Sequence, residues 1–403
     1  MHLQKDQTTQ WIARADRVVM KTYGRYPLVP VRGEGCRLWD ADGREYLDFL
    51  AGVAVNNLGH CHPAVVAALQ EQAARLIHCS NFYHIPQQIE LAEWLCAHSF
   101  ADRVFFCNSG AEANEAAIKL ARKWSREQHG ENRYEVITAT ASFHGRTLST
   151  ISATGQDKVK AGFEPLLPGF IHIPFGDLAS LEQAIGPRSC AVMLEPVQGE
   201  GGVNVPPPGY LRAVRALCDR HDLLLIFDEV QVGCGRTGSL WAHDQEEVEP
   251  DLMSLAKALA GGPPIGALLA REELAASLGP GSHGSTFGGN PLLCAAALAA
   301  MRTLTETGVL DNCLAMGALL RQRLLDLKER YPFIREVRGR GLILGMELTI
   351  DGAGLVEQAL RHGLLINCTV GRVLRFVPPL IVSPAEIDEA VTILDRVLAT
   401  VPA

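Results

Sequence analysis

The 403-residue chain lacks the sequence patterns that carry a protein into or across a membrane. Residues 1–16 contain no apolar segment of the secretory-signal type. No apolar run reaches membrane-spanning length without interruption by glycine or proline. None of the eleven cysteines belongs to a CxxC pair, so neither a disulfide framework nor a structural zinc site is expected. These absences predict a cytoplasmic protein with free thiols and no membrane partner.

Other absences narrow the kind of activity. The net charge of −8 comes from dispersed acidic residues, which disfavours nucleic acid as a partner. The sequence contains no P-loop, no G-x-S-x-G elbow and no HExxH motif. The densest group of candidate metal ligands, His60, Cys61 and His62, precedes Pro63 and fits the start of a helix better than a metal site. We therefore expect no metal.

Short apolar runs alternate with helical segments along much of the chain. Buried strands that alternate with helices indicate an α/β domain with a largely parallel sheet. The length of the chain favours two domains. The expected strands lie at residues 104–107, 134–139, 191–195, 223–227, 252–256 and 265–270.

The helix after the first run and the region after Pro291 complete the expected architecture. Ser109 and Glu112 form an S-x-x-E capping box, which predicts a helix start. Helical spacing then predicts a buried face made of Ala113, Ala116, Ala117, Leu120, Ala121 and Trp124. From Pro291 a long helical region, strand-like segments and a final helix near 384–398 predict a second, smaller α+β domain.

Lys257 is the only ionisable side chain between Leu252 and Ala270. A lysine beside apolar residues usually packs its stem on the surface and keeps its ammonium in water. Alternatively, a dry pocket lowers the pKa of the amine, which then forms a Schiff base with a carbonyl. The other polar residues at strand ends decide between these two interpretations.

Two strands end in groups suited to ligand binding. Gly110 follows a strand at a helix start, where unpaired N–H groups can bind a phosphate. Asp228 ends another strand, at the edge where parallel sheets bind ligands, and can pair with a buried cation. Taken alone, the first pattern also fits an ordinary capped helix and the second a solvated acid.

Other segments add an aromatic ring, two arginines and further acids. Phe143 and His144 follow a strand end and could stack on a planar ring. Arg146 is a guanidinium fork suited to a carboxylate. The remaining candidates are Glu195 at a strand end, Glu200 in a glycine-rich loop, the glycines and hydroxyls of residues 281–291, and Arg375 among apolar residues.

Residues 233–238, GCGRTG, match the dinucleotide fingerprint G-x-G-x-x-G. That fingerprint should follow a strand directly and open a helix. Here residues 228–232 intervene, and the segment that follows shows no helical period. A nicotinamide-dependent oxidoreductase is therefore kept only as the alternative from another enzyme class.

A phosphate-binding helix start, a stacking aromatic ring, an acid for a ring nitrogen and a solitary lysine together describe pyridoxal 5′-phosphate (PLP). The sequence resembles the fold-type-I, class III aminotransferases, and within that class the acetylornithine branch. The resemblance spans essentially the whole chain. It rests on the segments LGHCHP, FCNSGAEANEAAIKLAR, SFHGRT, EPVQGEGGV, LIFDEVQ, GRTG, LAKALAGG, GSHGSTFGGNP and LRFVPPL.

The resemblance implies an α/β fold of the type-I PLP transferases. Its large domain, residues 56–295, would contain a mostly parallel seven-stranded sheet and the cofactor. Residues 296–403 would form the smaller α+β domain, with residues 1–55 packed against it. Active sites shared between two subunits would make the enzyme a homodimer.

The resemblance also assigns cofactor-binding residues. Lys257 would form the Schiff base and then move the substrate proton, and Asp228 would keep the ring nitrogen protonated. Phe143 and Val230 would lie on the two ring faces, with Gln231 near the ring oxygen. The phosphate would be bound by Ser109, Gly110 and Ala111 and, from the neighbouring subunit, by Thr286.

The implied reaction is transfer of the distal amine of N²-acetylornithine to 2-oxoglutarate by a ping-pong route, in arginine biosynthesis. Arg146 would bind the carboxylate of the acylated ornithine, and Arg375 that of glutamate. Glu200 would neutralise Arg375 in the first half-reaction, and Ser285 would lie near the substrate. Succinylornithine, ornithine, succinyldiaminopimelate and 4-aminobutyrate remain alternative substrates.

The departures from the family pattern are Ala111 and Val232, where relatives often carry threonine and a small polar residue. Tyr23 or Tyr26 is expected to border the acyl pocket.

Overall fold

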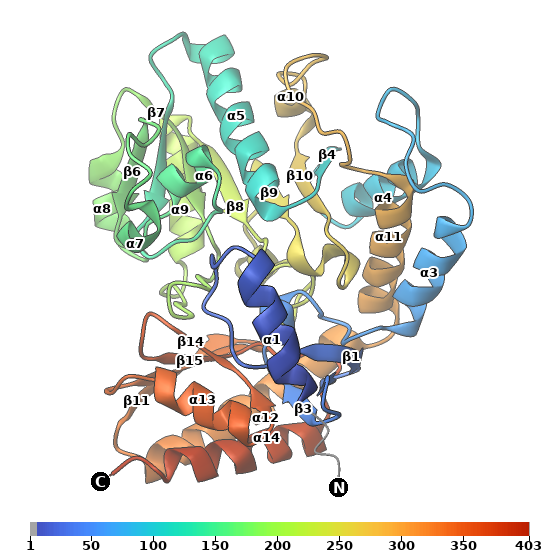
Figure 1. The fold of residues 1–403 in the computed structure, drawn as a ribbon. Coiled ribbons are helices and arrows are strands. Elements are labelled where there is room, and N and C mark those ends of the chain that lie inside the picture. Colours follow the sequence, from blue (N-terminus) through green and yellow to red (C-terminus); the bar gives the residue numbers. More distant parts are fainter. Residues whose placement is uncertain (1–5, 403) are drawn as a thin grey trace, which may run out of the picture.

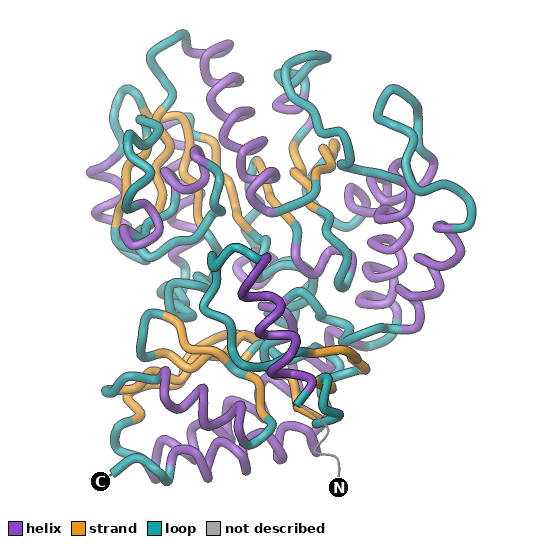
Figure 2. Tube along the Cα trace, in the orientation of Figure 1, coloured by secondary structure: helices purple, strands orange, loops and turns teal. Residues whose placement is uncertain are grey.

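The computed structural model describes residues 6–402, so the first five residues of the predicted segment 1–55 lie outside the described part. The chain forms three sheets with helices packed around them (Figures 1 and 2). The division into segments 1–55, 56–295 and 296–403 stays a prediction.

The largest sheet has seven strands in the order β4-β10-β9-β8-β7-β5-β6. All its neighbouring pairs are parallel except the two made by β10, which runs antiparallel to β4 and β9. The predicted fold class is therefore confirmed. The strands are β4 (Arg103–Cys107), β5 (Glu135–Ala139), β6 (Phe170–Ile173), β7 (Ser189–Leu194), β8 (Leu224–Asp228), β9 (Leu252–Leu255) and β10 (Gly266–Ala270).

Helices cover both faces of this sheet (Figure 1). In β8, Leu224 and Ile226 pack in one core with α5 (Gly110–His129), and Leu225 and Phe227 pack in another with α9 (Tyr210–His221). This alternation follows from the period of two in a strand, and it explains why buried strands read as continuous apolar runs. The other helices around the sheet are α6 (Leu148–Ala153), α7 (Asp157–Lys160), α8 (Leu178–Ala184), the 3-10 helices η1 (Ala242–Glu246) and η2 (Lys257–Ala260), and α10 (Glu272–Ala275).

The C-terminal part carries a four-stranded sheet in the order β11-β12-β15-β14. The long helices α12 and α14 pack against each other and lie together below its strands in Figure 1. The final helix begins and ends where the sequence predicted. The elements are α11 (Pro291–Glu306), α12 (Val309–Arg330), β11 (Ile334–Arg340), β12 (Ile343–Leu348), α13 (Ala353–Arg361), β13 (Leu364–Leu365), β14 (Asn367–Thr369), β15 (Val373–Phe376) and α14 (Pro384–Leu398).

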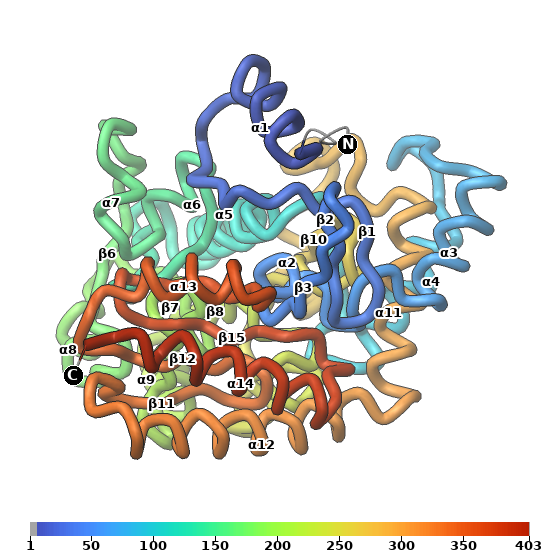
Figure 3. Tube along the Cα trace, turned by 60° about the horizontal axis from the view of Figure 1, so that its bottom comes forward, coloured from blue at the N-terminus to red at the C-terminus, as the bar shows by residue number. Residues whose placement is uncertain are grey.

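The third sheet has the order β1-β2-β3-β13. It joins the N-terminal strands to the C-terminal part of the chain, because β13 pairs in parallel with β3. Helix α1 stands apart from the sheets (Figure 3), and none of its residues is buried. The N-terminal elements are α1 (Gln7–Val18), β1 (Pro30–Glu34), β2 (Arg37–Asp40), β3 (Glu45–Asp48), α2 (Ala51–Ala54), α3 (Pro63–Ala73) and α4 (Pro86–Ala97).

Within residues 6–402, no single helix is both long and apolar enough to span a membrane; α11 and α12 meet that test only as a pair bent by 66°.

Candidate functional site

A cavity of about 420 Å³ opens where the carboxyl ends of β8 and β9 meet the N-terminus of α5. This volume lies in the range of small-molecule sites, and its position is the usual one for ligands of a parallel sheet. Eleven of the candidate residues line it: Ser109, Gly110, Ala111, Phe143, His144, Arg146, Glu195, Asp228, Val230, Gln231 and Lys257.

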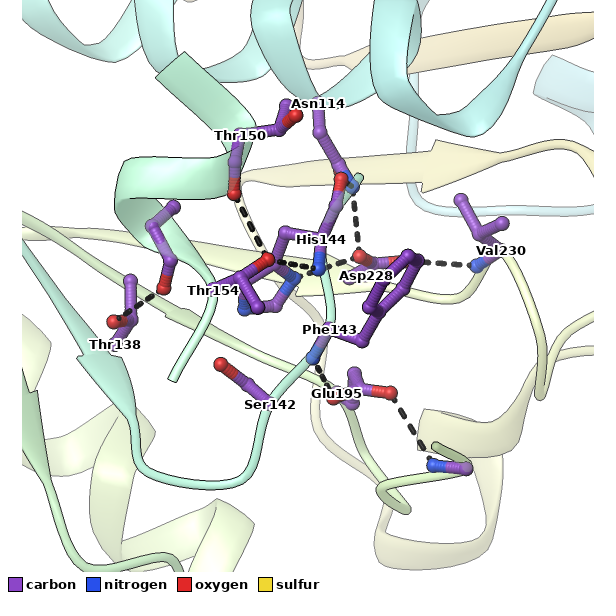
Figure 4. Close-up of polar contacts among 12 residues, drawn as sticks. Asn114, Thr138, Ser142, Phe143, His144, Thr150, Thr154, Glu195, Asp228 and Val230 are labelled. Atoms are coloured by element: carbon purple, nitrogen blue, oxygen red, sulfur yellow. Dashed lines mark hydrogen bonds and ion pairs between the residues drawn. The ribbon is translucent and has the colours of Figure 1, made fainter. Parts of the chain in front are cut away.

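Asp228 is held by three donors at the last residue of β8 (Figure 4). Its Oδ2 accepts from Asn114 Nδ2 at 2.7 Å and lies 2.8 Å from His144 Nδ1, and its Oδ1 accepts from the Val230 amide at 3.0 Å. The carboxylate, Asn114 and His144 are all buried. These contacts fix the carboxylate at the cavity wall, where it can pair with a cationic partner.

Two buried groups beside Asp228 have shifted pKa values. Burial alone would lower the pKa of His144, but the hydrogen bond and charge of Asp228 outweigh it and raise that pKa. Burial raises the pKa of Glu195 to about 7, although the charge of His144 and the amides of Phe143 and Gly199 oppose the shift. Both shifts favour the protonated form of the side chain.

The N-terminus of α5 forms the opposite wall. Ser109 is its N-cap, and the Ser109 hydroxyl accepts from the Glu112 amide at 3.2 Å. The Glu112 carboxylate accepts from the Asn108 amide at 2.7 Å, one residue before the position that the predicted capping box requires. A Cβ at Gly110 would come within 2.7 Å of Val230, so only glycine lets the helix start lie this close to β8. The unpaired N–H groups of this helix turn are suited to bind an anion.

Lys257 opens the short helix η2 two residues after β9, with a left-handed backbone φ of 36°. Its stem is half-buried and it lines the cavity. Burial lowers the pKa of its amine, and the carboxylates of Glu200 and Asp228 only partly oppose this. Among the described residues, the amine has no hydrogen-bond partner. The lowered pKa and the position in the cavity are consistent with a reactive amine, and the role of Lys257 stays a prediction.

Arg375 is fully buried on β15 and meets the cavity through Gln231. Its Nη1 donates to Glu200 Oε1 at 2.6 Å and to Gln231 Oε1 at 2.9 Å, and its Nε donates to Asn367 Oδ1 at 3.1 Å. Burial alone would raise the pKa of Glu200, but the charges of Arg375 and Lys257 lower it. Glu200 therefore neutralises Arg375 in this structure.

Arg146 is exposed at the rim of the cavity, with its guanidinium 5.4 Å from the centre of the Phe143 ring. No ion pair holds it within the described part of the chain. The cavity thus has one free guanidinium at its rim and one neutralised guanidinium at its base.

Ser285 and Thr286 line a different cavity, of about 890 Å³. The Ser285 hydroxyl accepts from Asn108 Nδ2 at 3.1 Å, which places it beside the first cavity, whereas Thr286 is exposed. Tyr23 and Tyr26 line a third cavity next to α1, away from Lys257. His60 pairs with Asp48 at 2.7 Å.

Sequence reasoning missed Asn114 and did not predict that His144 bonds to Asp228. His144 also lines the cavity, and its stacking on a planar ring stays a prediction. A signal was present for Asn114: it is a polar residue within the buried alanine face of α5. No local signal identifies the partner of His144, because β8 lies far along the chain.

The fold and the cavity define an α/β enzyme whose cavity, at the carboxyl edge of the sheet, holds a lysine amine and an aspartate carboxylate. Residues 18–398 match the family model described as aminotransferase class-III, and the chain belongs to that family. Its fold is that of the type-I PLP transferases.

The chain is similar to known aminotransferases over nearly its full length. Acetylornithine aminotransferase of Thermosynechococcus vestitus is 54% identical over 95% of this chain and 96% of its own. Ornithine aminotransferase of Toxoplasma gondii, whose structure has PLP at partial occupancy in the active site, is 39% identical, with a TM-score of 0.95 over 98% of this chain and 94% of that one. N-acetylornithine aminotransferase of Stenotrophomonas maltophilia is 42% identical, with a TM-score of 0.83 over 96% and 98%.

Proposed function

We propose that the chain is a PLP-dependent aminotransferase that moves the distal amine of N²-acetylornithine to 2-oxoglutarate in arginine biosynthesis. The observation that carries the proposal is the unpartnered amine of Lys257 in the same cavity as the Asp228 carboxylate and the start of α5. Relatives that bear the acetylornithine name at about half identity support the choice of substrate.

The residues around the cavity fit PLP. The free N–H groups at Ser109, Gly110 and Ala111 suit its phosphate, the Asp228 carboxylate suits a protonated ring nitrogen, and the Lys257 amine suits its aldehyde. When bound, the cofactor supplies an electron sink for the bond at the substrate carbon. Asp228 holds the proton on the ring nitrogen, Phe143 and Val230 orient the ring, and Lys257 moves the substrate proton.

The two arginines account for two dissimilar substrates. We infer that Arg146, free at the rim, takes the carboxylate of the acylated ornithine while Glu200 stays paired with Arg375. Glutamate would then bind Arg375 once Glu200 moves away. A paired guanidinium and carboxylate fix geometry as well as charge, which this exchange requires.

The spectrum of the purified protein tests the cofactor. A yellow protein whose visible band is fixed by borohydride is expected, because the reduced bond to Lys257 is stable. Lys257→Ala should abolish turnover, since no other amine lines the cavity among the described residues. Normal turnover of this variant would refute the role of Lys257.

A substrate panel tests the specificity. The ratio kcat/KM should be highest for N²-acetylornithine against succinylornithine, ornithine, succinyldiaminopimelate and 4-aminobutyrate. Arg146→Ala should impair the acetylornithine half-reaction more than the glutamate half-reaction. The reverse order would mean that the two arginines have each other's role.

The alternative oxidoreductase has little support, since residues 233–238 open no helix in the described structure.

We also propose a cytoplasmic homodimer. Its support is the position of Thr286, which is exposed, lies outside its own cofactor cavity and is next to the exposed apolar side chains of Phe82, Ile89 and Phe287, which a partner could cover.

A further inference from the structure

Arg236, in the GCGRTG segment, has no part in the function proposed above, yet its side chain is fully buried. Its contacts are unusual for a buried cation. Nη1 donates to the carbonyls of Leu342 at 2.9 Å and Pro378 at 2.5 Å, and Nη2 donates to Asn57 Oδ1. Within residues 6–402 its Nε has no partner, and no carboxylate pairs with the guanidinium.

Such a group is costly to bury. Burial lowers the pKa of Arg236 to about 10, which reflects the missing counter-charge. Carbonyl dipoles satisfy part of the guanidinium, but an apolar side chain could fill the same volume without that cost. The rigid fork of arginine does what an apolar group cannot: it reaches several acceptors at fixed angles.

The carbonyls of Leu342 and Pro378 lie at the same end of the strand pair β12 and β15. Leu342 directly precedes β12, and Pro378 follows β15, the strand that carries Arg375. In the antiparallel register Leu344 lies opposite Phe376 and Gly345 opposite Arg375. Arg236 therefore binds both strands within a few residues of Arg375. Figure 3 shows β12 and β15 side by side.

The loop that carries Arg236 connects it with the cofactor cavity. Its loop begins at the end of β8, where Asp228 stands, and continues through Gln231. The Gly233 amide donates to the Glu229 carbonyl at 2.9 Å, and Asn57 Nδ2 donates to the Cys234 carbonyl at 2.6 Å. The loop is thus fixed close to β8.

We propose that Arg236 is a positioning residue that fixes Arg375 relative to Asp228 and Lys257, and so sets the affinity for the substrate carboxylate that Arg375 binds. The inference rests on the proposed function, in that it takes Arg375 as a carboxylate-binding residue. Arg236 contacts no lining residue of the cavity directly; it acts through the ends of β12 and β15.

Arg236→Lys tests this, because lysine keeps the charge and loses the fork. The expected result in the holoenzyme is a rise of about tenfold in KM for 2-oxoglutarate and glutamate. The dissociation constant of glutarate, an unreactive dicarboxylate, should rise about as much in calorimetric titrations. KM for acetylornithine, kcat and the visible spectrum should stay within about twofold of the wild type.

Arg133→Lys is the matched control. Arg133 also bridges backbone carbonyls, those of Ser189 at 3.0 Å and Asp222 at 2.5 Å, but within the seven-stranded part of the chain. It should cost stability without changing any KM. If Arg236→Lys does not fold, Asn57→Ala, which removes one acceptor of the fork, should raise the same KM values less strongly.

Three outcomes would overturn the inference. The first is an unchanged glutarate affinity in both Arg236→Lys and Asn57→Ala. The second is an equal change of KM for acetylornithine and for 2-oxoglutarate and glutamate. The third is the same rise of KM in Arg133→Lys. Failure of the proposed function has a different signature: the wild type itself would be colourless or would transaminate none of the substrates.

Discussion

At the residue scale, the charge of Asp228 is the feature on which most of the neighbouring contacts depend. It accepts from Asn114 and Val230 and pairs with His144. The sequence placed Asp228 correctly at a strand end and Gly110 at the helix start after a strand, because an apolar run followed by an acid or by a helix cap is a local pattern. It did not provide Asn114 and His144 as partners, because those contacts join elements far apart in the chain.

Asp228→Asn should lower kcat by at least about 100-fold, because the amide cannot stabilise a protonated ring nitrogen. The cofactor content should stay near normal, since the phosphate contacts and Lys257 are retained. Turnover rates and the absorbance of the bound cofactor measure both. Asn114→Ser, which removes one hydrogen bond and keeps the charge, should lose less than about tenfold. An Asp228→Asn enzyme with wild-type kcat would contradict the assigned role.

Glu195 should make stability depend on pH. Its folded pKa of about 7 exceeds the ordinary 4.5, so between these values the folded protein keeps a proton that the unfolded chain has released. The free energy of unfolding therefore falls as pH rises through this window, by up to about 3 kcal/mol. Glu195→Gln should flatten the loss of melting temperature between pH 5 and pH 8, measured by thermal denaturation, relative to the wild type. An equal slope in both proteins would rule out this origin.

At the scale of elements, the apolar runs predicted six strands of the large sheet, each within two residues of the observed bounds. The seventh strand, β6 with the sequence FIHI, was not predicted from its residues. It lies at the sheet edge and is mostly half-buried, and its His172 interrupts the apolar pattern. An edge strand has one neighbour and needs less apolar surface, so its local signal is weaker. The antiparallel direction of β10 depends on pairing with β4 and was likewise not predictable from its own residues.

Ser109→Ala should distinguish two roles of the start of α5, which are helix capping and phosphate binding. The loss of the cap should cost about 1 kcal/mol of unfolding free energy, because the Glu112 amide loses its acceptor. Ser383→Ala removes an equivalent cap from α14, where Ser383 accepts from the Glu386 amide, and should cost about the same. Urea denaturation measures both losses. Only Ser109→Ala should also weaken PLP affinity, roughly fivefold, and an equal effect of both variants on PLP would argue against a phosphate site at Ser109.

At the scale of the whole molecule, the exposed apolar side chains near Thr286 predict the subunit interface. Phe82 is 94% exposed and Phe287 is 61% exposed, which is unusual for neighbouring aromatic residues of a monomer. Asn81 donates to the carbonyls of Ser285 and Gly288, so the two loops form one surface.

Phe82→Asp should shift the protein from dimer to monomer in analytical ultracentrifugation, because a charge would be buried at the contact. Activity should fall with the dimer fraction if Thr286 serves the neighbouring site. Val370→Asp is the control: Val370 is half-exposed with a left-handed φ of 46°, which aspartate tolerates well. A dimeric Phe82→Asp would show that the interface lies elsewhere.

The antiparallel direction of β10 also affects the dynamics of the segment that carries Lys257. Residues 256–265 alone separate β9 from β10, whereas the parallel neighbours are joined through longer crossovers. Short loops close with little entropy cost and re-form within microseconds. Since β9 and β10 also have a neighbour on each side, the amide hydrogens of Met253 and Leu268 should exchange slowly, and hydrogen exchange at these two residues measures this.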